Sequence, residues 1–438
     1  MSVKPFGIAV AVALGLLVQP NLAAAQQPPP DESVLGEFVV TGTVQEHVPK
    51  IAVLPSLSAA QEDVIVRGVV RNDLELSGLF EVISDNKAPP GLYDFEDPVD
   101  IEAWKKLGAE SVVKVAARPH KPSGIEVLGI AYFTSHGKDP VYESRLTVES
   151  SEARVTAHRI TDALLGALTG RPGSFASHFT FAGDWVKNRR VFSMDSDGHA
   201  LQPITEATLT AISPAWGPGG KLFYSASVDY SPFRLTVYDG QKHERLKLPF
   251  SGSIYGIAFN RDQTKLALAV AEDGGHSSIY VGKPDGTELK RASSTELSTH
   301  PVFSPSGKLA WIGGKAGQPQ RLWVDGKSIS PSGFTAAAPT FCDTEDGIRV
   351  VYAVVVGDKQ DLVMSTESGG GIQRLSQNQG SNSYPACSPD GRMLAFFSTR
   401  GKKKGMYVMS LIRWTSRKLA DQYGYSLRWD ALPPAKRR

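Results

Sequence analysis

The stretch from Ser383 to Phe397 decides the fold of this chain. It contains the strand-like phrase Pro385-Ala386-Cys387, the polar turn Asp390-Gly391-Arg392 and the apolar run Leu394-Ala395-Phe396-Phe397. Two apolar segments joined by a turn with Asp-Gly predict a β-hairpin. A loop and a third apolar segment, Met406-Tyr407-Val408-Met409, come next. The stretch therefore belongs to a small antiparallel sheet.

The same phrase recurs through the C-terminal part of the chain. Its five copies start at Pro214, Gly256, Pro301, Pro339 and Pro385, which lie 38 to 46 residues apart. This period is typical of four-stranded β-propeller blades. The segment from Ser177 to Thr205 supplies only three strands, and Tyr425 to Trp429 supplies a lone strand at the other end. We expect the lone strand to complete the three, so that six blades close into a ring that hides its sheet edges.

Both cysteines lie in this repeated part. Cys342 and Cys387 occupy offset positions in or beside the first strands of two successive repeats. Because successive strand residues point to opposite faces of a sheet, this offset favours two buried free thiols. A disulfide between them is the alternative.

A smaller domain of mixed periodicity precedes the repeats. We expect strands over 50–55, 80–83, 111–116, 124–133 and 141–149, and helices over 58–78, 97–108 and 151–168. Ser58, with Gln61 three residues later, predicts a capping box for the first helix, and Asp97 predicts the cap of the second. The sequence thus predicts an α+β N-terminal domain followed by an all-β six-bladed β-propeller, closed by a C-terminal strand.

The N-terminus has the pattern of a secretory signal peptide. Lys4, an apolar run from Ile8 to Val18 and the small residues Ala23-Ala24-Ala25 precede Gln26. We expect cleavage between Ala25 and Gln26, and the run is too short to span a bilayer. The expected parts are the signal peptide (1–25), a mobile N-terminal arm (26–47), the α/β domain (48–172), the propeller (173–431) and a basic tail (432–438). We therefore expect an exported protein with no membrane span.

The sequence gives little support for catalysis. A formal net charge of +2, with no long basic run, argues against nucleic-acid binding. The chain lacks the Gly-x-Ser-x-Gly pentapeptide of hydrolases, and its histidines are not paired at metal-ligand spacing. We expect a monomer without catalytic residues, metal or cofactor. The alternatives are a propeller enzyme with a metal ion in its central channel, and a propeller that binds a sugar polymer such as peptidoglycan.

The connections between successive blades offer a candidate binding surface, because they converge on one face around the channel. They contribute Ser213, Ser253, Tyr255, Thr299, His300, Ala338, Ser383 and Tyr384. Tyrosine and histidine among small uncharged residues are typical of a protein-docking centre. The alternative is that these loops only connect strands.

Four stretches resemble a known family. Glu102–Val113 contains Trp104, Leu107 and Gly108 before an apolar strand, and Ala157–Phe175 joins a helix end to the propeller. Ile51–Pro55 and Arg71–Phe80 resemble the family's first core strand and the end of its first helix. The family is TolB, the periplasmic propeller proteins of the Tol–Pal envelope system.

This resemblance implies a non-enzymatic adaptor in the periplasm that supports outer-membrane integrity and constriction at division. It implies that the propeller face binds the peptidoglycan-associated lipoprotein, Pal, through the inter-blade loops, with Thr299 and His300 as the best single pair of candidates. It also implies that the N-terminal arm binds TolA of the inner-membrane Tol complex. The part of the arm able to pair as a strand is Glu37, Phe38, Val39 and Val40.

Overall fold

The computed structural model describes residues 30–36 and 47–432, except Leu57, Ala59, Leu92, Tyr230, Lys402 and Lys403. The expected signal peptide, its cleavage point at Ala25 and Gln26, and the arm residues Glu37 to Val40 lie outside the described residues. Among the described helices, none is both long and apolar enough to cross a bilayer. From Glu32 onward the chain forms one compact unit, so the domain limits given above stay a prediction.

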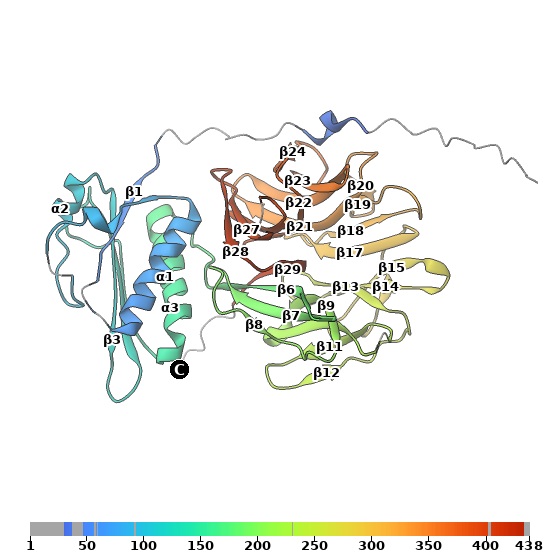
Figure 1. Cartoon of the computed structure of the whole chain (residues 1–438), viewed down its shortest axis with the longest axis horizontal. Coiled ribbons are helices and arrows are strands. Elements are labelled where there is room, and N and C mark those ends of the chain that lie inside the picture. The colour runs from blue at the N-terminus through green and yellow to red at the C-terminus, as the bar shows by residue number, and fades with distance from the viewer. Residues whose placement is uncertain are drawn as a thin grey trace, which may run out of the picture. The chain divides into compact units, whose positions relative to one another are not determined.

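A five-stranded sheet forms the N-terminal part (Figure 1). Its strands are β1 (Lys50–Val53), β2 (Glu81–Val82), β3 (Ser111–Pro119), β4 (Ile125–Phe133) and β5 (Tyr142–Val148). Their order is β2-β1-β3-β4-β5, with β1 parallel to β2 and β3, and β3, β4 and β5 antiparallel. The hairpin expected from the sequence is β4 with β5.

Helices cover both faces of this sheet. They are α1 (Gln61–Ser77), α2 (Ile101–Lys106) and α3 (Ala153–Thr169). The short 3-10 turns are η1 (Glu32–Leu35), η2 (Asp85–Lys87), η3 (Ser150–Glu152), η4 (Pro218–Gly220) and η5 (Asp273–Gly275). Ile51 and Val53 pack with α1 and α3, whereas Ala52 packs with Trp104 of α2, as the alternation of a strand requires. Figure 1 shows α1 and α3 side by side.

Two predicted helix caps are wrong. The N-cap of α1 is Ala60, and the Ser58 hydroxyl accepts a hydrogen bond from the Ala60 N–H at 3.1 Å within a local turn. The cap of α2 is Asp100, whose carboxylate accepts from the Ala103 N–H at 3.1 Å. The Asp97 carboxylate is engaged in the preceding turn, where it accepts from the Asp94 N–H at 2.7 Å. Short polar side chains often make such local turns, which compete with capping.

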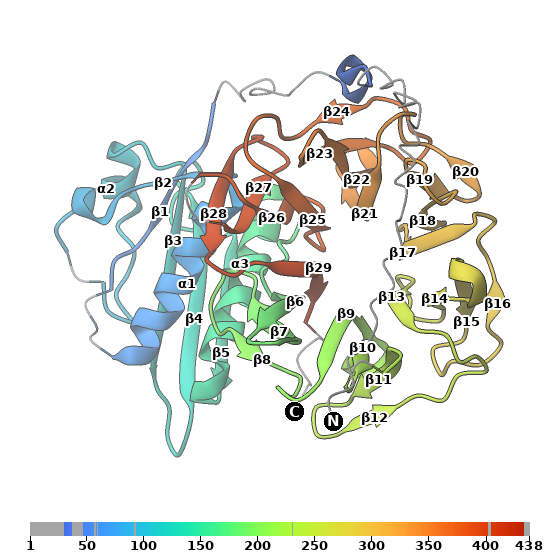
Figure 2. The same ribbon diagram turned by 45° about the vertical axis from the view of Figure 1, so that its right-hand side comes forward.

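Six four-stranded sheets follow, arranged in a ring (Figure 2). Blade 1 has β9 (Thr210–Gly217), β10 (Lys221–Ser227), β11 (Arg234–Tyr238) and β12 (His243–Arg245), and blade 2 has β13 (Ile254–Phe259), β14 (Leu266–Ala271), β15 (Ser277–Gly282) and β16 (Lys290–Arg291). Blade 3 has β17 (Leu297–Phe303), β18 (Leu309–Gly314), β19 (Arg321–Val324) and β20 (Lys327–Ser328), and blade 4 has β21 (Ala336–Thr344), β22 (Gly347–Val356), β23 (Lys359–Thr366) and β24 (Gln373–Arg374). Blade 5 has β25 (Asn382–Cys387), β26 (Met393–Ser398), β27 (Gly405–Ser410) and β28 (Ser416–Ala420).

The sixth blade confirms the closure expected from the sequence. It combines β6 (Ser177–Trp185), β7 (Asn188–Asp195) and β8 (Gln202–Pro203) with the C-terminal β29 (Gly424–Ala431). β29 pairs antiparallel with β6, and the Trp429 indole N–H donates to the Ser177 hydroxyl at 2.8 Å. The first strands of the blades face the middle of the ring in Figure 2.

The prediction of free thiols is wrong, because Cys342 and Cys387 form a disulfide with a Cα–Cα distance of 5.4 Å. Neighbouring blades stack face to face around the ring, so the front of one blade meets the back of the next. The offset between the two cysteines, which points their side chains to opposite faces of their own blades, is therefore what a bridge between β21 and β25 needs. Both residues belong to the apolar cluster between blades 4 and 5.

Candidate docking site at the channel mouth

The first strand of every blade carries a β-bulge near its start. The pairing register shifts around Ser213, Tyr255, His300, Ala338, Tyr384 and Ser426. A bulge bends its strand and turns the extra side chain in a new direction. Because first strands line the channel, the six bulged residues form a ring at one mouth of it. We call this set the mouth ring.

The backbone of the mouth ring is strained. Ser213, His300, Ala338, Tyr384 and Ser426 have φ between 45° and 54°, the left-handed region that L-residues avoid. Four of them precede a proline, which further disfavours a helical backbone. Each such residue costs about 1 to 2 kcal/mol. The same strain thus recurs at the equivalent position of five blades.

Aromatic side chains from separate blades gather at the mouth. The ring centroids of His300 and Tyr384 lie 6.3 Å apart, and those of Tyr384 and Tyr425 lie 5.9 Å apart. His300 and Tyr384 come from blades 3 and 5, and Ala338 of blade 4 presents only a methyl group at the ring position between them. The guanidinium of Arg189 lies 4.1 Å from the centre of the Tyr425 ring. Such aromatic groups supply large contact area at low cost in side-chain entropy.

The remaining predicted residues either belong to the mouth ring or lie next to it. The Ser213 hydroxyl donates to the Tyr255 carbonyl at 2.6 Å and so ties blade 1 to blade 2, while the Tyr255 side chain is 47% exposed. The Ser253 hydroxyl accepts from the Phe233 N–H at 3.1 Å, and Thr299 contacts the His300 ring nitrogen through its hydroxyl at 3.1 Å. Ser383 is buried. Of the eight predicted residues, five belong to the mouth ring, and Thr299 contacts one of them, His300. Ser253 and Ser383 lie beside the mouth.

His300, the titratable imidazole of the mouth ring, is neutral at neutral pH. Burial lowers the pKa of His300 to about 4, and the positive charge of Arg428 acts in the same direction. Burial also raises the pKa of the Tyr384 phenol. His300 and Tyr384 are thus neutral, and a charged group beside them is the Arg189 guanidinium on the Tyr425 ring. Aromatic side chains with little charge between them favour docking of a protein surface.

A cavity of about 470 Å³ lies at the other end of the first strands. Its walls include the five aromatic residues Trp216, Phe259, Phe303, Phe341 and Trp429. Each of them also packs into a different apolar cluster. Near this end the Arg171 guanidinium donates to the backbone carbonyls of Asp343 and Asp390, at 2.9 and 2.5 Å. The N-terminal part thus holds the propeller at the end opposite to the mouth ring.

One cluster of the described residues has the composition of a metal site. Oxygen and nitrogen atoms of Asp73, His158 and Asp197 lie within 4.8 Å of one another. However, the Arg154 guanidinium lies 2.6 Å from the Asp197 oxygen that would face an ion. A fixed positive charge at that distance repels a cation, so the cluster fits a metal ion poorly.

Comparison with known proteins agrees with both parts of the fold. Residues 37–128 match the family described as the TolB amino-terminal domain. The "Tol-Pal system protein TolB" of Anaeromyxobacter dehalogenans is 27% identical over 292 residues, which cover 64% of this chain and 63% of that protein. The crystal structure of TolB from Acinetobacter baumannii superposes with a TM-score of 0.73 at 20% identity, over 88% of this chain and 97% of that one.

The chain resembles TolB in its N-terminal sequence and in its whole fold. A "Protein TolB homolog" of Chlorobium luteolum is 26% identical over 58% of each chain. The match to the curated relatives spans less than two thirds of their length. The resemblance to TolB and the six-bladed propeller, both expected from the sequence, are therefore confirmed.

Sequence reasoning missed three parts of this mouth. It assigned Tyr425 only to the closing strand, it did not include Ser426, and it did not anticipate Arg189. A signal for the ring was present, because four of the repeated phrases begin with proline and the strained residue directly precedes it. Arg189 comes from β7 and reaches Tyr425 only through closure of the sixth blade, which no local pattern encodes.

The predicted arm is partly docked in the described residues. Leu35 of η1 is fully buried in the apolar cluster formed by blades 3 and 4, and the Glu32 carboxylate lies 2.9 Å from the Arg374 guanidinium. The Arg374 guanidinium also pairs with Asp361 at 2.6 Å. These contacts anchor residues 32–36 of the arm to the rim of the propeller.

Proposed function

We propose that this protein is a non-enzymatic adaptor of the Tol–Pal system that acts in the periplasm. In this proposal the mouth ring binds the peptidoglycan-associated lipoprotein, Pal. The observation that carries the proposal is the left-handed backbone at the same position of five blades, together with the aromatic side chains that meet at this end of the channel. Resemblance to curated relatives that are named for the Tol–Pal system supports the choice of partner.

The proposal gives the N-terminal arm a second partner, TolA of the inner-membrane Tol complex. The residues concerned, Glu37 to Val40, follow directly after the anchored residues 32–36. Anchoring of residues 32–36 on the propeller rim would tether the segment that follows to the body, and a segment able to pair as a strand can bind a partner by strand addition. Binding of both partners at once would support outer-membrane integrity and constriction at division.

A pull-down from envelope extract tests both assignments. The mature chain is compared with His300→Ala and with a deletion of residues 26–40. His120→Ala is the matched control, because His120 is exposed in a turn of the N-terminal sheet. We expect loss of Pal with His300→Ala, loss of TolA with the deletion, and no change with His120→Ala.

Two results would contradict the proposal. If both altered proteins keep both partners, neither surface does what is proposed. If the purified chain contains a stoichiometric metal ion in its channel, or is retained on isolated peptidoglycan without Pal, the adaptor role gives way to an enzyme or a sugar-binding propeller.

A further inference from the structure

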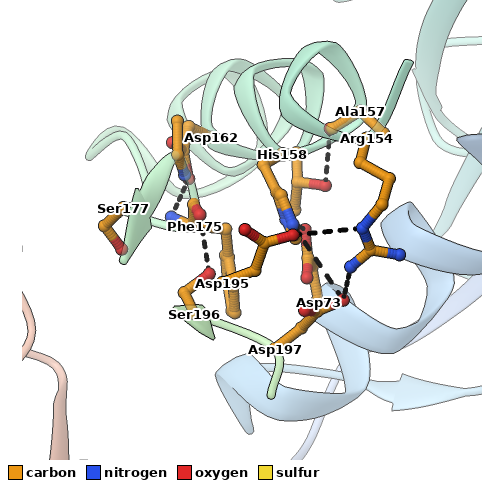
Figure 3. A network of polar contacts seen from close by, with 12 residues as sticks. Asp73, Arg154, Ala157, His158, Asp162, Phe175, Ser177, Asp195, Ser196 and Asp197 are labelled. Atoms are coloured by element: carbon orange, nitrogen blue, oxygen red, sulfur yellow. Dashed lines mark hydrogen bonds and ion pairs between the residues drawn. The ribbon is translucent and has the colours of Figure 1, made fainter. Parts of the chain in front are cut away.

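A buried network of charged side chains joins α3 to blade 6 (Figure 3). His158 lies in the middle of α3, and its imidazole is only 2% exposed. Its Nδ1 atom is 2.7 Å from an Asp73 carboxylate oxygen on α1, and its Nε2 atom is 3.9 Å from an Asp197 oxygen in the turn after β7. One imidazole therefore lies between a carboxylate of the N-terminal part and a carboxylate of the propeller.

Arg154, one turn before His158 on α3, completes the contact. Its Nε donates to the Asp195 carboxylate at 3.1 Å, and its Nη2 donates to the Asp197 carboxylate at 2.6 Å. The network thus holds three carboxylates against one guanidinium. With a neutral imidazole its net charge is −2, and with a protonated imidazole it is −1. A buried net charge is costly, so each proton that enters stabilises the packed arrangement.

Two further titratable groups lie beside the network. His199 places its Nδ1 atom 3.3 Å from the same Asp197 oxygen, but its side chain is 65% exposed. Asp162, one turn beyond His158, accepts hydrogen bonds from the Phe175 and Ala176 N–H groups at 2.5 and 2.9 Å. Burial raises the pKa of Asp162 to about 7. Asp162 therefore titrates near neutral pH as well.

The electrostatics of His158 and Asp73 favour proton uptake, whereas Asp197 resists it. Burial acts to raise the pKa of Asp197, but the positive charges of His158 and Arg154 outweigh burial and lower it. Burial alone would lower the pKa of His158, but the carboxylates of Asp73, Asp197 and Asp195 outweigh it and raise this pKa. Burial raises the pKa of Asp73 to about 6, despite its contact with His158. Groups whose pKa is higher in the packed form bind protons more tightly there than when exposed. Packing is therefore strongest at mildly acidic pH and weakens as the pH rises through these values.

We infer that the interface between α3 and blade 6 is a proton-sensitive clasp, in which a protonated His158 holds the N-terminal part on the propeller. Loss of the proton leaves Asp73 and Asp197 facing a neutral ring in a site that excludes water. His158 Nε2 and one Asp73 oxygen already have no hydrogen-bond partner there. The inference concerns the coupling of the two parts and holds whether or not the mouth ring binds Pal.

The contact made by Arg171 provides an internal comparison. Its acceptors are the backbone carbonyls of Asp343 and Asp390, which do not titrate. Arg171→Gln should therefore loosen the interface equally at every pH. This variant also raises the separated population to a level at which a pH effect can be measured.

The test measures the distance between the two parts by spin-label spectroscopy. Labels are placed on Lys106→Cys and Lys242→Cys, both exposed, in the full mature chain with its native disulfide intact. In the Arg171→Gln background we expect the ratio of docked to separated molecules to fall several-fold between pH 6 and pH 9. Adding His158→Gln should remove most of this change of the ratio with pH. Asp162→Asn, measured in parallel, gives the part of the pH dependence that is due to Asp162.

An unchanged pH dependence of the ratio of docked to separated molecules in the His158→Gln protein would overturn the inference. Circular dichroism shows whether each variant folds, and Asp197→Asn replaces His158→Gln if that protein does not fold, with the same loss of pH dependence expected. If EDTA at pH 7.5 separates the two parts of the unsubstituted chain, a metal ion and not a proton holds the network. That result would also overturn the inference.

Discussion

At the scale of single residues, the account depends on the strained backbone of the mouth ring. Ala338 has a φ of 45°, and its side chain is nearly buried. Ala338→Gly should leave the free energy of unfolding within about 1 kcal/mol of the parent, because relief of the left-handed strain offsets the lost methyl group and the added freedom of the unfolded chain. Ala353→Gly, in the ordinary strand β22, should cost about 1 to 2 kcal/mol. Urea unfolding of the two proteins measures the difference. Equal losses would show that Ala338 is not strained.

The protonation of His300 gives a second prediction at this scale. Burial and the charge of Arg428 lower its pKa to about 4, so the imidazole is neutral from pH 8 down to about pH 5. Because a protonated ring would bring an unpaired charge into the interface, affinity for the partner should be flat over this range and fall only as the pH approaches 4. Calorimetric titration with the soluble domain of Pal at pH 8, 6.5 and 5 checks this. A loss of affinity centred near pH 6.5 would mean that His300 is exposed and ordinary.

At the scale of elements, the disulfide links the first strands of two successive blades. Cys342 and Cys387 are 45 residues apart, so the bond closes a long loop and restricts the unfolded chain. Replacing both with alanine should lower the free energy of unfolding by about 4 kcal/mol. Urea unfolding with and without reductant provides the measurement. Reductant should lower the free energy of unfolding of the parent and leave that of the alanine protein unchanged. If reductant does not change the stability of the parent, the bond is excluded.

The closing strand β29 gives a matched pair of tryptophans. Trp429 is 7% exposed and bonds to Ser177 across the closure, whereas Trp185 is 43% exposed at the end of β6. Trp429→Ala should cost about 3 to 5 kcal/mol of stability, and Trp185→Ala about 1 kcal/mol or less. Thermal unfolding compares them. Similar costs would show that β29 contributes little to closing the ring.

These elements also mark how far the sequence alone could lead. Repeats at Pro214 and its four counterparts, together with the lone strand at Trp429, were sufficient for six blades, because blade period and strand count are local properties. The disulfide was missed because its geometry depends on how one blade stacks on the next. The caps at Ser58 and Asp97 were missed because each side chain forms a local turn instead. The contact between Arg189 and Tyr425 depends on closure of the ring and was out of reach for the same reason as the disulfide.

At the scale of the whole molecule, the two ends of the channel have different roles. Arg171 holds the N-terminal part at the end of β21 and at the turn that follows β25, and the mouth ring lies at the opposite ends of these strands. The mouth is thereby left as a surface for a partner. The central claim is that the protein acts by docking Pal on this surface.

The most direct test is the affinity of the purified mature chain for the soluble domain of Pal, measured by calorimetry at neutral pH. We expect tight binding by the parent and by His120→Ala, and at least about a 30-fold loss for His300→Ala and for Tyr384→Ala, as for central residues of an interface. Equal affinity in all four proteins would contradict the account, and so would the absence of binding by the parent.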